Sequence, residues 1–410
     1  MFFFRLILIG YLIPALFVDV LKVQIGSFYY LDFFFLSSLI YILKNYKILF
    51  KATHFFKASL ISIKLLKYFL ILCLFYVIIS YLNYIQIHNI DDSDGFKLID
   101  SYIPRHSYFI FYSLIGISLF FSISKNFDKF IKDLDLVFYL TPLIIVSQYL
   151  GFSESRIGST LIPFCIYYIY NKNKILAIIY FSAFFIMYYG ENTTNILSLF
   201  ITLIFILDKE KFLFKSAIKY KFLFIGVIFF LGNLAYSNIK NLQDYDENVG
   251  GRLLFWQDNF ETLEKTNYMG VGFGTPYFSS IGAFYLSGYD ENEVEIDVIY
   301  VTGQHSSIIN MFYRVGIIGG VLFVLFNVYV LWETRRTIIL LRNQKNKQMK
   351  ELVNVFLLAL VLGFMNVAFH VGLESPRVFI GYLIFISLII TINNILRIKA
   401  KEVLPENQST

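Results

Sequence analysis

One histidine and four arginines are the residues whose types and positions best suit chemistry in this sequence: His305, Arg156, Arg252, Arg314 and Arg377. A guanidinium group can hold a phosphate through two parallel hydrogen bonds, so several arginines without matching carboxylates predict a pyrophosphate site. A neutral imidazole accepts protons near neutral pH, which makes His305 a candidate general base. Together these residues predict proton transfer beside a bound pyrophosphate.

Each of these residues also has a purely structural interpretation. Arginines at the ends of apolar spans commonly extend to lipid headgroups, which accounts for Arg377 and for Arg105. Arg314 fits that explanation less well, because it lies eight residues into an apolar run, where a charge is costly unless it faces a cavity or a partner. For His305, which directly precedes the same run, the alternative is a capping role at the start of a helix.

Two motifs in the longest polar segment have to position these side chains. The stretch from Arg252 to Phe260 is amphipathic and predicts a short helix on the membrane surface. The motif Met269-Gly-Val-Gly-Phe-Gly-Thr-Pro276 lacks the flanking strand and helix of a nucleotide-binding fingerprint, so we predict a tight turn there, since glycine accepts positive φ. The acidic residues between 290 and 297 lack the glycine and the spacing of a calcium-binding loop, and no metal site is predicted.

The composition is that of a polytopic membrane protein. Hydrophobic residues make up 57% of the 410 residues, charged residues only 16%, and the mean hydropathy is +0.64. The net charge of +6 does not indicate nucleic-acid binding, because the cationic residues are spread over the connections between apolar runs. Cys73 and Cys165 each lie inside such a run and predict neither a disulfide nor a metal site.

Twelve apolar runs are candidates to cross the ~30 Å hydrocarbon core of a bilayer. They span residues 3–20, 28–43, 66–87, 107–124, 134–152, 157–170, 174–190, 192–207, 221–238, 306–332, 351–371 and 377–396. We find neither an internal repeat nor a linker between them. The sequence therefore predicts an all-α polytopic membrane protein of about twelve transmembrane helices, with residues 1–410 forming a single integral membrane domain.

The distribution of lysine and arginine orients these spans, because cytoplasmic connections are enriched in positive charge. One alternating set of connections, together with both termini, holds 26 of the 35 Lys and Arg residues, and the opposite side keeps nine. We therefore predict that both termini are cytoplasmic and that the first span is retained as a signal anchor. A large loop, residues 239–305, then lies outside, between spans nine and ten, and carries the candidate site.

The segment from His305 onward resembles a known family. His305-Ser306, nine intervening residues and Gly316-Ile-Ile-Gly319 resemble the signature of the O-antigen ligases. The preceding order of Arg252, Trp256 and the glycine motif is similar to that of the related Wzy-type O-antigen polymerases. The stretch Gly190-Glu-Asn-Thr-Thr-Asn195 departs from the pattern, because family members often carry an arginine there.

The resemblance implies a metal-independent, inverting glycosyl transfer without a cofactor, on the periplasmic side of the bacterial inner membrane. The donor would be an undecaprenyl-pyrophosphate-linked oligosaccharide. Carried over to this sequence, the family roles assign Arg252 to the pyrophosphate and His305 to the acceptor hydroxyl. Arg156 is placed like another arginine of the family, and Arg156, Arg314 or Arg377 would have to complete the phosphate site.

Three functions remain open on the sequence. An O-antigen or other surface-polysaccharide polymerase is favoured over a ligase, because polymerases of this layout tend to be rich in Phe, Ile and Tyr, as this chain is. A flippase or other transporter of lipid-linked oligosaccharides is the third, although transporters usually show two similar halves and this sequence does not. The expected partners are the lipid-linked donor, the phospholipid bilayer and, for a polymerase, a chain-length regulator; no nucleic acid is expected.

Overall fold

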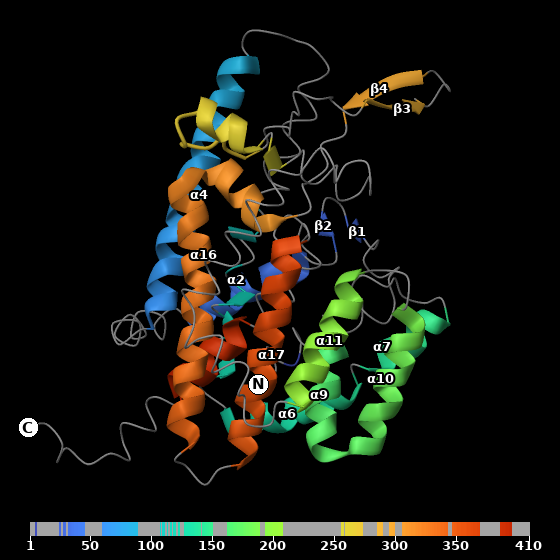
Figure 1. Ribbon diagram of the computed structural model, residues 1–410. Helices are drawn as coiled ribbons and strands as arrows, with labels where there is room; N and C mark the ends of the chain where they lie inside the picture. The colour runs from blue at the N-terminus through green and yellow to red at the C-terminus, as the bar shows by residue number, and fades with distance from the viewer. Residues whose placement is uncertain are drawn as a thin grey trace, which may run out of the picture.

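A computed structural model of the chain shows a bundle of helices with two short β-hairpins (Figure 1). The described residues are 5, 24–25, 28–29, 32–45, 60–88, ten positions between 107 and 123, 127–140, 142–150, 162–188, 193–207, 256–257, 259–273, 285–289, 295–299, 306–342, 347–369 and 386–395. Predicted spans 3–20 and 221–238 fall almost entirely outside them, so the number of spans stays a prediction.

Two long helices, α4 (Ile61–His88) and α16 (Ser307–Arg342), pack along one another (Figure 1). Their segments Ile61–Leu82 and Ser307–Ile339 are long and apolar enough to cross a membrane. The helices approach closely at Gly319, where an added Cβ would lie 3.4 Å from Leu72 Cδ2. This pair forms the frame on which the candidate site is built.

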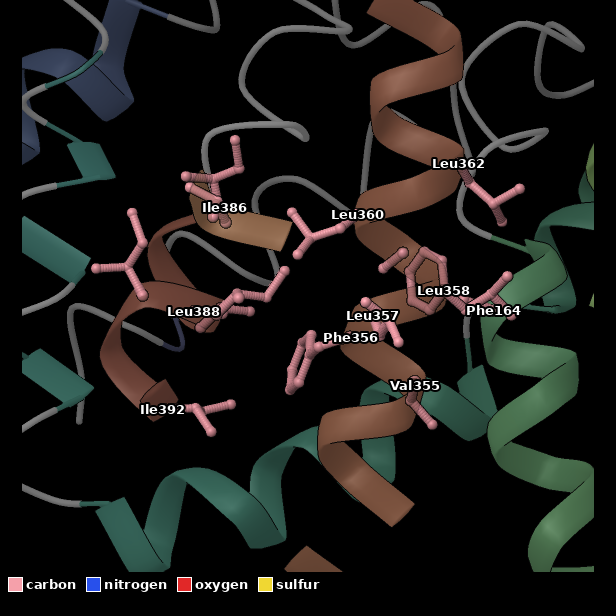
Figure 2. Close-up of a cluster of buried hydrophobic side chains, with 14 of the residues drawn as sticks. Phe164, Val355, Phe356, Leu357, Leu358, Leu360, Leu362, Ile386, Leu388 and Ile392 are labelled. Atoms are coloured by element: carbon pink, nitrogen blue, oxygen red, sulfur yellow. The ribbon is translucent and has the colours of Figure 1, made fainter. Parts of the chain in front are cut away.

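The remaining described helices are shorter. They include α2 (Asp32–Lys44), α6 (Phe127–Leu140), α7 (Leu143–Tyr149), α9 (Ile162–Lys172), α10 (Lys174–Tyr188), α11 (Thr193–Leu207), α17 (Lys347–Phe369) and the segment Ile386–Ile395. One apolar cluster joins several of them. Figure 2 shows Phe356 and Leu360 of α17 near Leu388 of the last helix, and Phe164 of α9 reaching the same cluster. In a bilayer, the van der Waals packing of these side chains against one another stabilises the bundle.

Helix α16 extends ten residues beyond its predicted end at 332. At that point Trp332 packs edge-on against Tyr329, and the guanidinium of Arg336 lies 4.7 Å from the centre of the Trp332 ring. Aromatic residues beside arginine are typical of a membrane interface. The extension is therefore the part of α16 that continues past the apolar layer on the side predicted to be cytoplasmic.

Directly after Trp332, the buried carboxylate of Glu333 on α16 binds the first turn of α4. It accepts hydrogen bonds from the backbone N–H of Ser62 at 3.3 Å and from the Ser62 hydroxyl at 2.5 Å. The first turn of a helix has backbone N–H groups without intrahelical partners, and negative charge is favourable there. The contact fixes the register of the two long helices at this end.

Two expected helices are wrong in detail. The predicted span 134–152 is divided, because α6 ends at Leu140 and α7 begins only after a turn at Pro142. Proline lacks a backbone N–H and disfavours the helical conformation of the residue before it. The predicted span 28–43 begins instead with a strand, β2 (Phe28–Tyr29), paired with β1 (Gln24–Ile25), and helix α2 follows.

The described part of the chain is predominantly helical, as the sequence predicts, with two short hairpins in addition. The second hairpin lies in the predicted outer loop and pairs β3 (Tyr285–Tyr289) with β4 (Glu295–Ile299) in antiparallel register. Tyrosines at both ends of β3, and isoleucine and valine in β4, are residue types that favour extended backbone. Two of the acidic residues singled out in the sequence, Glu295 and Asp297, are on β4, so this part of the loop has regular backbone structure.

Candidate functional site

The predicted tight turn exists at the glycine motif. Gly270 and Gly272 have φ angles of 79° and 83°, which only glycine adopts readily. The prediction of a turn is confirmed for these two glycines, while Gly274 lies outside the described residues. We refer to residues 268–273 as the glycine turn.

A short helix, residues 256–265, leads directly into the glycine turn; residue 258 within it is not described. It overlaps the predicted helix 252–260 from residue 256 onward and continues to 265, with Asn259 and Leu263 buried and Phe260 exposed. Its end is a Schellman motif, in which the N–H groups of Asn267 and Tyr268 donate to the carbonyls of Glu264 and Leu263, at 2.9 and 2.7 Å. Asn267 has φ 51°, a left-handed conformation that asparagine tolerates better than most residues.

The glycine turn is bonded through its backbone to a break in α16. Gly316 has φ 69° and ψ −175°, so the regular hydrogen bonds of the helix stop there. The N–H groups of Val271 and Gly272 donate to the carbonyls of Tyr313 and Arg314, each at 2.9 Å. In the opposite direction, the N–H of Ile317 donates to the Tyr268 carbonyl at 3.1 Å. Bonds that an unbroken helix would make internally are thus exchanged for bonds to the turn.

Side chains larger than hydrogen do not fit at this contact. A Cβ on Gly316 would lie 2.6 Å from the Tyr268 carbonyl oxygen, and one on Gly270 would lie 2.4 Å from the Gly316 nitrogen. The positive φ of Gly316 adds a second requirement for glycine. At Gly319, the other glycine of the signature, a Cβ would come within 2.6 Å of Val315 Cβ. Gly316, together with Gly270, therefore allows the break in α16 and the close approach of the turn, whereas Gly319 lies against Val315 of its own helix and Leu72 of α4.

Helix α4 holds the other side of the glycine turn through two polar side chains. The Ser80 hydroxyl accepts a hydrogen bond from the N–H of Phe273 at 2.8 Å and donates to the Tyr76 carbonyl at 2.7 Å. The Tyr76 hydroxyl donates to the carbonyl of Met269. We did not identify either residue from the sequence, where their only signal is a polar group on an apolar helix.

Arg314 is completely buried beside the turn, with no exposed side-chain surface. Its Nη1 donates to the carbonyl of Gly272 at 3.2 Å, and its guanidinium lies 5.4 Å from the Tyr313 ring. Figure 1 shows the start of α16 turning away from the long axis of the helix, so the depth inferred from an unbroken helix does not apply to this arginine. The hydrogen bond ties the Arg314 side chain to the glycine turn, and its predicted contact with the pyrophosphate stays a prediction.

Ser306, not His305, takes the capping position at the start of α16. Its hydroxyl oxygen accepts from the Ile309 N–H at 3.4 Å, its carbonyl accepts from Asn310 at 3.0 Å, and the residue is buried. The Ser306 side chain therefore serves as the N-cap of α16. Four predicted site residues lie outside the described part of the chain: Arg156, Arg252, His305 and Arg377.

The chain path nevertheless relates two of these residues to the turn. Arg252 precedes the first described residue of the short helix, Trp256, by four positions, and that helix ends at the glycine turn. His305 directly precedes Ser306, and the segment 307–315 ends at the break in α16 to which the turn is bonded. The segments that follow Arg252 and His305 therefore meet at one junction.

Comparison with known protein families places this junction in a recognised domain. Residues 143–324 match a family model described as O-antigen ligase. The matched region runs from α7 through the glycine turn to the signature glycines Gly316 and Gly319. A comparison with curated proteins finds no match. Residues 143–324 thus carry a domain similar to the O-antigen ligase family, and the apolar helices together with this match indicate an integral membrane protein.

Proposed function

We propose that this protein is a surface-polysaccharide polymerase of the O-antigen type in the bacterial inner membrane. The observation that carries the proposal is the junction within the family-matched region, where the break at Gly316 is bonded to the glycine turn and so joins the segments that follow Arg252 and His305. The enzyme transfers a glycan from an undecaprenyl-pyrophosphate donor to a lipid-linked repeat unit in the periplasm. Both chain termini are cytoplasmic, and residues 239–305 form the periplasmic loop of a single integral domain.

The proposed chemistry needs positively charged side chains beside the donor's pyrophosphate and a base beside the acceptor hydroxyl. Arg252, with Arg156 and Arg377, holds the pyrophosphate, because guanidinium groups bind phosphate oxygens in pairs and offset the charge of the leaving group. The acceptor hydroxyl oxygen attacks the anomeric carbon as the bond to the pyrophosphate breaks, and the configuration inverts. His305 takes the hydroxyl proton. Arg314 stabilises the position of the glycine turn beside the site. These roles require neither a metal nor a cofactor.

A ligase that delivers the glycan to lipid A-core is the second candidate, and it is favoured by the description of the matching family. The same junction and the same roles of Arg252 and His305 serve either acceptor. The polymerase is preferred for the abundance of phenylalanine and tyrosine, 47 and 31 residues, which is typical of polymerases of this layout. A flippase is the third candidate and is disfavoured by the lack of repeated halves in the sequence.

Reconstitution with defined acceptors tests the proposal. The full chain in proteoliposomes, supplied only with an undecaprenyl-pyrophosphate-linked repeat unit, is expected to produce a ladder of longer lipid-linked glycans. Products that form only after lipid A-core is added would instead identify a ligase. Movement of the repeat unit across the bilayer without any new glycosidic bond would identify a transporter. A chain-length regulator, if it is a partner, is expected to change the length distribution of the ladder but not its formation.

The orientation of the loop is a separate prediction. A cysteine at Ser287, which is on β3 opposite Asp297 of β4, is expected to react with a membrane-impermeant maleimide in cells whose outer membrane has been permeabilised. A cysteine at Gln344, after the end of α16, is expected to react only after the inner membrane is opened. The physical reason is the bias of lysine and arginine to the cytoplasmic side. Labelling in the reverse pattern would overturn the orientation and the site with it.

A further inference from the structure

We infer that Tyr76, Ser80 and Arg314 are positioning residues of the transferase site, acting through the glycine turn. None of them is assigned a contact with the reacting atoms. They hold the turn, and the turn holds the segments that follow Arg252 and His305 in one relative placement. The inference rests on the proposed function, because it concerns the geometry of that same site.

The break in α16 depends on the turn for its hydrogen bonds. Without the turn, the carbonyls of Tyr313 and Arg314 and the N–H of Ile317 would lose the partners they have in the structure. Backbone groups in an apolar environment must be paired, so removal of the turn would favour either a straight helix or a different bend. Either change redirects the segment 307–315, and with it the residue before its cap, His305.

Helix α4 is hydrogen-bonded to both ends of the glycine turn. Tyr76 holds Met269 near the start, and Ser80 holds Phe273 at the end. The Phe273 side chain is buried and its ring lies 5.9 Å from that of Phe109, so this end is also anchored by packing. Two hydrogen bonds from residues one helical turn apart restrain both the position and the tilt of the turn relative to α4.

Arg314 ties the middle of the turn to α16. Its side chain donates to the Gly272 carbonyl, while its own carbonyl accepts from the Gly272 N–H, so the two residues are joined in both directions. A buried guanidinium also neutralises the negative end of the carbonyl dipole it faces. The turn is therefore held by α4 on one side and by α16 on the other.

Loss of one of these contacts is expected to slow transfer rather than weaken donor binding. A displacement of about 1 Å at a reacting centre costs up to about a hundredfold in rate. We expect Ser80→Ala and Tyr76→Phe each to lower kcat by about tenfold or more, with the KM for the lipid-linked donor within about twofold of wild type. The level of protein in the membrane should not change. Tyr68→Phe is the matched control, because Tyr68 is on α4 but 60% exposed, and it should behave as wild type.

A labelling measurement reports on the turn without requiring activity. Phe273 is only 2% exposed, so Phe273→Cys should react slowly with an impermeant maleimide, and the addition of Ser80→Ala or Tyr76→Phe should accelerate the reaction. Unchanged labelling would show that α4 does not hold the turn. Faster labelling with wild-type kcat in the single variants would show that the turn does not position the site. If the wild-type protein transfers no glycan, the proposed function fails, but the labelling result still decides whether α4 holds the glycine turn. If the Ser80→Ala protein does not accumulate, Tyr76→Phe is used for both measurements.

Discussion

Replacement of Arg252 by alanine is expected to abolish glycan transfer while the protein remains at its normal level in the membrane. A diphosphate leaving group needs positive charge in place before its bond to the sugar breaks. In the chain path, Arg252 comes just before the short helix 256–265, whose end is held by a Schellman motif and the glycine turn. Complementation of a polymerase-deficient strain, scored by polysaccharide ladders and by membrane protein level, measures the effect.

Two further variants separate the guanidinium from positive charge in general. Arg252→Lys should retain part of the activity, because an ammonium group carries the charge but not the paired hydrogen-bond donors. Lys265→Ala removes an exposed cation at the other end of the same short helix and should leave the ladders unchanged. Full ladders from Arg252→Ala at normal expression would remove Arg252 from the site.

The second large effect is expected at His305, where alanine should slow transfer strongly and leave binding of the lipid-linked donor nearly intact. A neutral imidazole can take the proton of the incoming sugar hydroxyl, whereas the arginines already hold the diphosphate. Activity should also decline as the pH falls and the imidazole becomes protonated. Transfer rate and donor binding, measured for the same preparation, provide the test.

His305→Asn distinguishes catalysis from helix capping. Asparagine is a good capping residue, so it would preserve activity if the histidine merely capped α16. The structure weakens that alternative, because the Ser306 hydroxyl already accepts the hydrogen bond from Ile309. We therefore expect His305→Asn to be as slow as His305→Ala. Transfer by His305→Asn at the wild-type rate would contradict the role as a base and leave a structural one.

Local features of the sequence were sufficient for several elements near the site. The alternating glycines predicted a tight turn, and Gly270 and Gly272 have the positive φ angles that such a turn requires. The pattern after Arg252 predicted a short helix over 252–260, which overlaps the observed helix 256–265, and the change from polar to apolar residues at 306 predicted where α16 begins. These predictions succeeded because each depends on the conformational preference or periodicity of consecutive residues.

Other local signals were present but were outweighed by composition. Pro142 divides a predicted span into α6 and α7, since a proline interrupts helical hydrogen bonding even in an apolar run. The strands β1 and β2 precede α2 within another apolar stretch, and β3 and β4 lie in a segment assigned only as loop. Short apolar or aromatic stretches suit both helix and strand, and hydropathy alone does not separate them.

What only the tertiary structure decided is the junction itself. The sequence separates Ser80, Gly272 and Arg314 by long stretches of chain, and an apolar periodicity continues through Gly316 as if the helix were unbroken. The break is stable because the glycine turn, a distant segment, provides the missing backbone partners, and because α4 provides Ser80 and Tyr76 on the other side. Hydrogen bonds between segments so far apart depend on how the helices pack, and local preferences do not contain that information.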